Sequence, residues 1–240
     1  MKLPQLVLTF AVAVAMLIGC HKSNNTITAP ASLNIVNAIA GSQPVIPVLG
    51  TTDTIQYYSS AAMIGYTSTL LYSPLSGPNI LYVVQKTDTA PSKEKLFNGT
   101  LNLDAGGIYS FFLSGDTTKA DTLFVRDQIP VYSDSSTGVR FGNLSPGSQP
   151  FTITLNGNTP SQTEFSGLGY RQIASFKNYI ANSSVIGNNY KFVIRDQASG
   201  DSLMTYQWNY PRFKNNTLVI AGMKDSVGVK ALRVFSVNNY

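Results

Sequence analysis

The sequence predicts an all-β protein made of two tandem β-sandwich domains of the immunoglobulin-like kind. Three observations predict this: short segments that alternate apolar and polar residues, turn residues between them, and an internal repeat of about 106 residues. Alternation with a period of two is typical of a strand with one buried face. Phe151–Leu155 alternates strictly and stops at Asn156-Gly157, a pair that favours a hairpin turn. Roughly seven short strands in about 100 residues fit a sandwich. A closed barrel is the alternative fold.

Short segments rich in Val, Ile, Phe and Tyr are the predicted strands, because these residues favour strands. In order they are Leu33–Val36, Tyr109–Leu113, Leu123–Arg126, Val139–Gly142, Phe151–Leu155, Tyr190–Arg195, Thr217–Ala221 and Leu232–Val237. Turn signals such as Asp104–Gly107 and Ser199–Asp201 fall between them. Helical signals are few: Gln172–Tyr179 is long enough for a turn or two, and Glu94–Phe97 for less. We expect Trp208 in the core.

Two stretches of the chain repeat one another. At an offset of 106, Leu33–Pro44 aligns with Val139–Pro150, Asn37 meets Asn143, and the string Gly-Ser-Gln-Pro meets itself. Later matches pair Gly65-Tyr66 with Gly169-Tyr170, Tyr82–Val84 with Phe192–Ile194, and Phe111–Gly115 with Leu218–Gly222. This period is too long for a solenoid and close to a common domain size. The repeat therefore predicts one sandwich domain over residues 32–133 and a second over residues 134–240.

The N-terminus predicts a secreted, lipid-anchored protein. Lys2 precedes an apolar run, Leu6–Ile18, whose 13 residues are too few for a membrane span of about 20. This pattern is typical of a signal peptide, here residues 1–19. Leu17–Cys20 resembles the lipobox of bacterial lipoproteins, which implies that Cys20 carries the lipid and anchors the chain in the cell envelope. We expect the outer membrane, and the lack of acidic residues after Cys20 favours its periplasmic leaflet over the cell surface. Residues 20–31 are polar and predict a flexible tether.

Strand motifs in both halves resemble the envelope lipoproteins of domain-of-unknown-function family 4397. Val139–Pro146 fits that family's strand with Asn before Ser-Pro, and Tyr109–Gly115 fits its strand with Tyr and a final Gly. Asn34–Ala40 lacks the Ser-Pro, and Asn216–Gly222 lacks the tyrosine. The resemblance implies two immunoglobulin-like sandwiches with no established activity, and it transfers no catalytic residue.

The composition excludes several chemistries. The only histidine, His21, lies in the tether, and the only cysteine is Cys20. A Ser-His or Cys-His nucleophile, a His-ligated zinc and a disulfide are therefore absent, and we expect no metal and no cofactor. Without Lys2 the chain has a formal net charge of +4, and its Lys and Arg residues form no run. This pattern does not favour nucleic-acid binding.

Three groups of residues remain as candidates. Two glutamates and ten aspartates leave room for a paired-carboxylate hydrolase, although most aspartates lie at turn positions. Six Asp-Ser/Thr triplets resemble a bacterial O-glycosylation sequon, with acceptors at Thr54, Thr89, Thr117, Thr122, Ser202 and Ser226. The alternative is that these triplets begin turns. Six tyrosines either line a binding face or pack the strands: Tyr57, Tyr58, Tyr66, Tyr72, Tyr206 and Tyr210. Arg126–Gln128 and Arg195–Gln197 are interpreted as strand-end turns and not as a site.

These observations predict a lipid-anchored envelope protein with a non-enzymatic binding, adhesion or structural role. The ligand stays open, with a glycan and a protein as the candidates. Two other functions stay open. An exposed row of aromatic residues is the feature that would distinguish an accessory glycan-binding lipoprotein. A carboxylate-dependent hydrolase requires two acidic side chains that face each other in a cleft.

Overall fold

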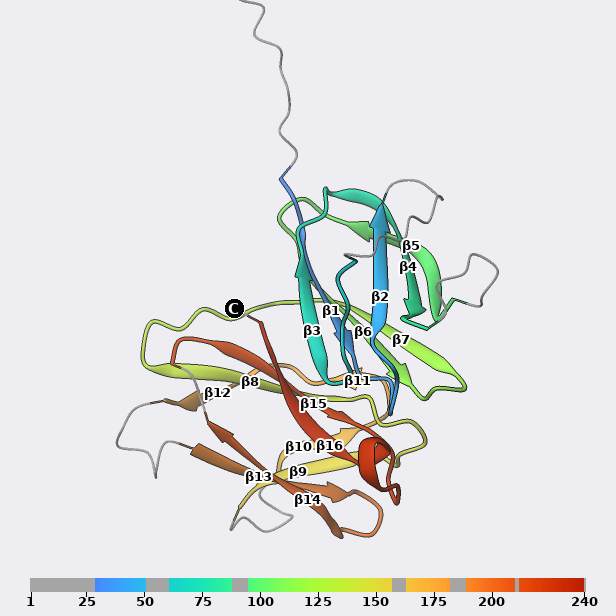
Figure 1. Ribbon diagram of the computed structural model, residues 1–240. Helices are drawn as coiled ribbons and strands as arrows, with labels where there is room; N and C mark the ends of the chain where they lie inside the picture. Colours follow the sequence, from blue (N-terminus) through green and yellow to red (C-terminus); the bar gives the residue numbers. More distant parts are fainter. Residues whose placement is uncertain are drawn as a thin grey trace, which may run out of the picture.

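The computed structural model describes residues 29–50, 61–87, 95–156, 163–181, 189–209 and 212–239 (Figure 1). Within these ranges the protein is built from β-strands, with one short 3-10 helix, η2 (Gly228–Lys230). The first half contains β1 (Ser32–Asn37), β2 (Val45–Gly50), β3 (Ser68–Tyr72), β4 (Gly77–Gln85), β5 (Phe97–Leu103), β6 (Ile108–Gly115) and β7 (Ala120–Arg126). The second half contains β8 (Ser136–Asn143), β9 (Phe151–Leu155), β10 (Thr163–Leu168), β11 (Gln172–Ile173), β12 (Lys177–Ile180), β13 (Asn189–Asp196), β14 (Ser202–Asn209), β15 (Asn215–Ala221) and β16 (Arg233–Asn238).

Each half is a sandwich of two sheets. The N-terminal sandwich consists of an inner sheet, β3-β1-β6-β7, and an outer sheet, β2-β4-β5. The C-terminal sandwich consists of an inner sheet, β11-β8-β15-β16 with β12 also on β8, and an outer sheet, β10-β9-β13-β14. In both inner sheets one pair of neighbours is parallel, β1 with β6 and β8 with β15. The all-β sandwich prediction is confirmed, and the division into domains at residues 32–133 and 134–240 stays a prediction.

Apolar side chains from both sheets fill each sandwich. The N-terminal core includes Leu33, Phe111 and Leu81, and the C-terminal core includes Phe141, Phe192 and Trp208. Each of these side chains has an exposed fraction of 4% or less, so the prediction that Trp208 is a core residue is confirmed. Alternate residues of each strand enter these cores, as the period of two predicts.

The strand registers support most of the internal alignment and correct one part of it. Ile35 pairs with Phe111, and Phe141 pairs with Leu218, which agrees with the predicted offsets. The match of Tyr82–Val84 with Phe192–Ile194 is wrong by one residue. Pro47 pairs with Val83 and Ile153 pairs with Ile194, so Val83 corresponds to Ile194. A slip of one residue would turn every side chain to the opposite face, and the structure keeps both residues in a core.

The repeated Asn and Gly-Ser-Gln-Pro form the same turn twice. Asn37 Nδ2 donates to the Ile64 carbonyl at 3.1 Å and to Ser42 Oγ at 3.1 Å. Asn143 Nδ2 donates to the Leu168 carbonyl at 3.0 Å and to Ser148 Oγ at 3.0 Å. The glycine before each serine has a φ near +70°, which favours glycine. The repeated string is therefore a structural turn.

The predicted helical turns at Gln172–Tyr179 are wrong. This segment forms β11 and β12, two short strands that both pair with β8. Between them the chain stays attached to β8, because Ala174 N donates to the Phe141 carbonyl at 2.8 Å. The open edge of β8 supplies backbone partners, and these outweigh a weak local preference for helix.

A third apolar cluster joins the two sandwiches. The outward faces of the two inner sheets meet around Val36, Phe112, Val219 and Val237, all fully buried. In Figure 1 the N-terminal sandwich lies above the C-terminal one, with the inner sheets facing each other. The two halves therefore form one body with three contiguous cores.

Candidate functional site

The interface between the sandwiches is built from duplicated positions. The registers of β1 with β6 and of β8 with β15 make Asn34 the counterpart of Arg140 and Ser110 the counterpart of Thr217. In the same way Asp127, whose amide follows β7, is the counterpart of Asn239. Two grooves occupy corresponding places at opposite ends of this interface. The two grooves differ in the side chains that occupy them.

The filled groove contains an ion pair that connects the sandwiches. Arg140 Nη2 lies 2.5 Å from Asp127 Oδ1, with side chains 5% and 1% exposed. Arg140 Nε donates to Thr217 Oγ1 at 2.8 Å, and Ser110 Oγ donates to Asp127 Oδ2 at 2.6 Å. The Phe176 ring covers the guanidinium at 4.5 Å. About 210 Å³ of space remains around these groups.

The open groove lies at the corresponding position between β3 and β15. Its volume is about 470 Å³, within the usual range for small-molecule sites. The N-terminal sandwich contributes Asn34, Thr69, Leu70 and Leu71, and the C-terminal sandwich contributes Lys214, Asn215 and Asn238. Four of these residues have a counterpart in the filled groove: Asn34 with Arg140, Thr69 with Ile173, Leu70 with Ala174, and Asn238 with Arg126.

Amide groups replace the ion pair in the open groove. Asn34 stands where Arg140 stands in the filled groove, and its carbonyl oxygen accepts a hydrogen bond from the Thr69 hydroxyl. Asn239 stands where Asp127 stands, and it accepts a hydrogen bond from Thr217 Oγ1 at 2.5 Å. Because the shorter Asn34 replaces an arginine, the groove is wider here. The open groove is the candidate functional site.

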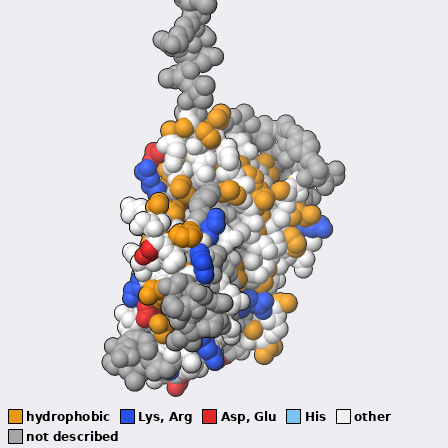
Figure 2. Space-filling model, turned by 90° about the vertical axis from the view of Figure 1, so that its left-hand side faces the viewer, with side chains coloured by type: hydrophobic (Ala, Val, Ile, Leu, Met, Phe, Trp, Pro, Cys, Tyr) orange, Lys and Arg blue, Asp and Glu red, His pale blue; other side chains and the backbone are white. Residues whose placement is uncertain are grey.

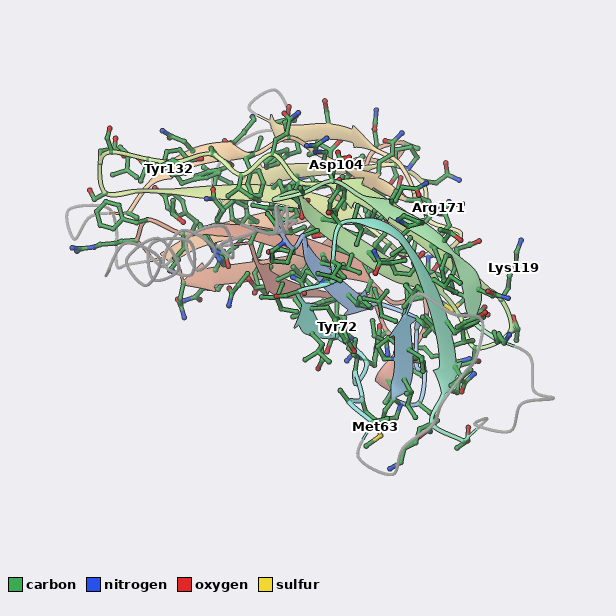
Figure 3. All side chains as sticks on the ribbon, turned by 90° about the horizontal axis from the view of Figure 1, so that it is seen from above. Met63, Tyr72, Asp104, Lys119, Tyr132 and Arg171 are labelled. Atoms are coloured by element: carbon green, nitrogen blue, oxygen red, sulfur yellow. The ribbon has the colours of Figure 1, made fainter. Side chains whose placement is uncertain are left out.

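Two tyrosines extend across the interface at the end away from the connection between the sandwiches. The hydroxyl of Tyr170 donates to Asp121 Oδ2 at 2.9 Å and lies 3.2 Å from Ser114 Oγ. Its counterpart, Tyr66, lies against the Arg233 guanidinium at 5.2 Å. In Figure 3 Lys119 and Arg171, one from each sandwich, lie at the same end of the molecule, and Tyr132 lies at the opposite end.

The pKa of Tyr170 is raised from 10.0 to about 12, chiefly by burial; within this net shift the hydrogen bond with Ser114 lowers the pKa and the hydrogen bond to Asp121 raises it. The folded state thus favours the protonated phenol. This contribution to stability is present below pH 10 and is lost as the pH rises towards 12. We expect Tyr170→Phe to lose less stability than the wild type between pH 10 and 12 in urea unfolding. An equal loss of stability in Tyr170→Phe and in the wild type would contradict the raised pKa of Tyr170.

Four of the predicted glycosylation acceptors are described, and the structure does not bring them together. Thr117 and Ser202 are exposed, and Thr122 and Ser226 are half-buried. The triplet beginning at Asp116 forms a turn, since the Asp116 carboxylate accepts hydrogen bonds from the Thr118 and Lys119 amides. Cys20, Thr54 and Thr89 lie outside the described residues. Glycosylation and lipidation stay predictions.

The candidate tyrosines do not form an exposed aromatic row within the described chain. Tyr66, Tyr72 and Tyr206 are each partly buried, and burial raises the pKa of each phenol. Tyr57, Tyr58 and Tyr210 lie outside the described residues. Core packing accounts for Tyr72 and Tyr206, which lie on β3 and β14, and Tyr66 lies in a turn and packs against the cluster between the sandwiches.

The placed carboxylates have structural roles. Glu164 accepts a hydrogen bond from the Tyr179 hydroxyl at 2.8 Å, and Asp196 pairs with Lys224 at 2.9 Å. The hydrogen bond from Lys224 lowers the pKa of Asp196. Across the described ranges, no three His, Cys, Asp or Glu side chains gather closely enough to hold a metal ion. None of the described helices is long and apolar enough to cross a membrane.

Surface charge is dispersed on the visible face. Figure 2 shows Lys and Arg side chains spread over that face among Asp and Glu, with no single basic patch. The Arg126–Asp104 pair, at 2.7 Å, is an example in which both side chains are more than 60% exposed. Such exposed pairs contribute little to stability.

Sequence reasoning missed the role of Asp127 and Arg140. It interpreted Arg126–Gln128 as a strand-end turn, whereas Asp127 is 7% exposed and forms the buried ion pair. The internal alignment carried a signal, because it places Arg140 opposite Asn34. At this repeated position one copy has a charged residue and the other has an amide. The two copies of the interface therefore differ in chemistry there.

Comparison with known proteins leaves the family open. No protein-family model matches the chain, and no curated protein matches it. One similar crystal structure is CBMbc, a family 26 carbohydrate-binding module from Eubacterium rectale Amy13K in complex with maltoheptaose, with 11% identity over 83% of this chain and 97% of that chain and a TM-score of 0.28. Another is a protein proposed to be an adhesin from Bacteroides ovatus, with 10% identity over 88% of this chain and 95% of that chain and a TM-score of 0.23. Similarity at these TM-scores does not establish a shared topology or function.

Proposed function

We propose that this chain is a lipid-anchored, non-enzymatic binding protein of the bacterial cell envelope, and that the open groove is its ligand site. The observation that carries the proposal is the contrast between the two grooves. The same interface position is narrowed by an ion pair to about 210 Å³ at one end and left as a volume of about 470 Å³ at the other. Non-enzymatic binding fits a groove lined by amides, a hydroxyl, an amine and leucines, without a carboxylate or histidine.

The anchor is tested at Cys20. We expect the wild-type chain, expressed in a Gram-negative host, to incorporate an alkyne-labelled fatty acid and to sediment with membranes. Cys20→Ala removes the acylated thiol, so we expect its label to fall to background. Ser23→Ala, a nearby change that keeps the thiol, is the matched control and should label like the wild type. Persistent labelling of Cys20→Ala would overturn the anchor.

The site is tested by fragment mapping. We expect a library of small polar fragments, added to the isotope-labelled full chain, to shift the NMR side-chain signals of Asn34, Asn215 and Asn238 before any others, because concave sites with a few polar groups concentrate ligand binding. The filled groove is the internal control, so the Gln128 side-chain signal should stay constant. Fragments that gather elsewhere and leave Asn34 unshifted would contradict the proposed site.

A further inference from the structure

We infer that the open groove binds a neutral saccharide, an inference that rests on the proposed function of the same site. The open groove lacks the two charges that the filled groove contains. In the filled groove an arginine and an aspartate supply opposite charges, whereas the open groove has Asn34 and Asn239 at those positions. Both charges are therefore missing together, and the two buried polar residues of the lining, Asn34 and Asn215, which we call the floor of the groove, are neutral.

A neutral floor favours a neutral ligand. Asn34 and Asn215 are 9% and 4% exposed, so a ligand group that reaches them leaves water. A charged group there would lose its hydration without meeting an opposite charge, which is unfavourable. Lys214 is the one charged residue of the lining, and it lies exposed at the rim. No described carboxylate lies within ion-pair distance of its ammonium group.

The polar groups match hydroxyls. An asparagine amide offers a carbonyl acceptor and two N–H donors, and a sugar hydroxyl both donates and accepts. Asn34, Asn215 and Asn238 line the groove from both sandwiches, and Thr69 adds a hydroxyl. The Thr69 hydroxyl donates to the Asn34 carbonyl oxygen and Asn215 Nδ2 donates to the Pro130 carbonyl, so these atoms offer a ligand their remaining hydrogen-bonding capacity. A saccharide presents many such hydroxyls at short spacing and carries no charge to desolvate.

The leucines match the carbon face of a sugar ring. Leu71 is 51% exposed and Leu70 is partly buried, so the groove presents an apolar wall beside its amides. Burial of apolar surface against this wall would add to binding. A peptide would also offer amides, but the exposed edge of β3 would bind it through backbone atoms, and that mode does not need an empty groove.

The experiment closes the open groove by copying the filled one. Asn34→Arg with Asn239→Asp places the ion pair of Arg140 and Asp127 at the corresponding position. Binding is measured by saturation-transfer NMR on the full-length chain, purified in a detergent without a sugar headgroup. The probes are maltotriose, cellotriose, chitotriose, trigalacturonic acid and a neutral tripeptide. The unfolding midpoint of each variant is recorded, so that loss of binding is distinguished from loss of fold.

We expect at least one neutral trisaccharide to bind the wild type. Its affinity for the double variant should be lower by at least about tenfold, while the unfolding midpoint of the double variant is preserved. Lys191→Met, the control on the exposed face of β13 and outside the lining of either groove, should change the wild-type affinity by less than about twofold. If Asn34→Arg with Asn239→Asp unfolds the chain, Asn238→Arg replaces it, because it changes an exposed lining residue to the arginine found at its counterpart, Arg126, in the filled groove. Selective binding of trigalacturonic acid, a charged saccharide, or of the peptide would overturn the inference of a neutral saccharide and leave the groove as the ligand site. If no probe binds the wild type, the saccharide inference is overturned. If a saccharide binds the folded double variant as tightly as the wild type, both the inference and the assignment of the open groove as the ligand site are overturned.

Discussion

Replacing Arg140 by methionine is expected to lower the free energy of unfolding by about 3–5 kcal/mol. The carboxylate of Asp127, 1% exposed, would then remain buried with only the Ser110 hydroxyl and no opposite charge. Methionine keeps much of the volume under Phe176. The decrease in the free energy of unfolding is therefore caused by the unpaired charge and not by a cavity. Chemical denaturation of the wild type and the variant measures it.

Two further variants make this result specific. Arg126→Met breaks an ion pair of similar length between side chains that are more than 60% exposed, and it should cost less than about 1 kcal/mol. Arg140→Met combined with Asp127→Asn removes both charges, as the open groove does, and should recover most of the lost stability. An effect of Arg140→Met no larger than that of Arg126→Met would show that the pair does not hold the interface.

Replacing Asn143 by alanine is expected to lower the free energy of unfolding by roughly 2–4 kcal/mol. Its side chain satisfies the Leu168 carbonyl and the Ser145 amide, each at 3.0 Å, and both would lose a buried partner. Each unsatisfied buried group costs about 1–3 kcal/mol. The measurement is urea denaturation of each variant beside the wild type.

The duplication supplies the matched control for this variant. Asn37 makes the same bonds in the N-terminal sandwich, to the Ile64 carbonyl and the Ile39 amide, so Asn37→Ala should lose a similar amount. Asn178 is exposed on β12, and Asn178→Ala should change stability by less than about 0.5 kcal/mol. A loss at Asn143 no larger than at Asn178 would contradict the role of the turn.

Much of the fold could be predicted because it depends on local patterns. Strict alternation located Phe151–Leu155, which is β9 in the structure, and the internal repeat aligned Asn37 with Asn143, which make equivalent hydrogen bonds. The segment 172–179 failed because its pairing partner, β8, lies about 30 residues earlier, and pairing at such a distance leaves no local trace. The slip at Val83 has a related cause, since Leu81–Val84 is buried throughout and does not alternate.

The candidate site was less accessible to sequence reasoning. Exposed tyrosines were the expected signal for a binding face, and the three that the structure places are partly buried. The open groove instead depends on the way two sandwiches meet, which brings Asn34 beside residues about 180 positions later. Only comparison of the two copies, Asn34 against Arg140 and Asn239 against Asp127, indicates that one groove is filled and the other open.

The central claim is that the shared interface joins two sandwiches into one body and so creates the open groove. Calorimetry of the full chain tests it most directly. The account predicts one thermal transition whose calorimetric and van't Hoff enthalpies agree, and Arg140→Met should move this whole transition to lower temperature. Two separate transitions, with Arg140→Met shifting only the one that belongs to the C-terminal sandwich, would contradict it.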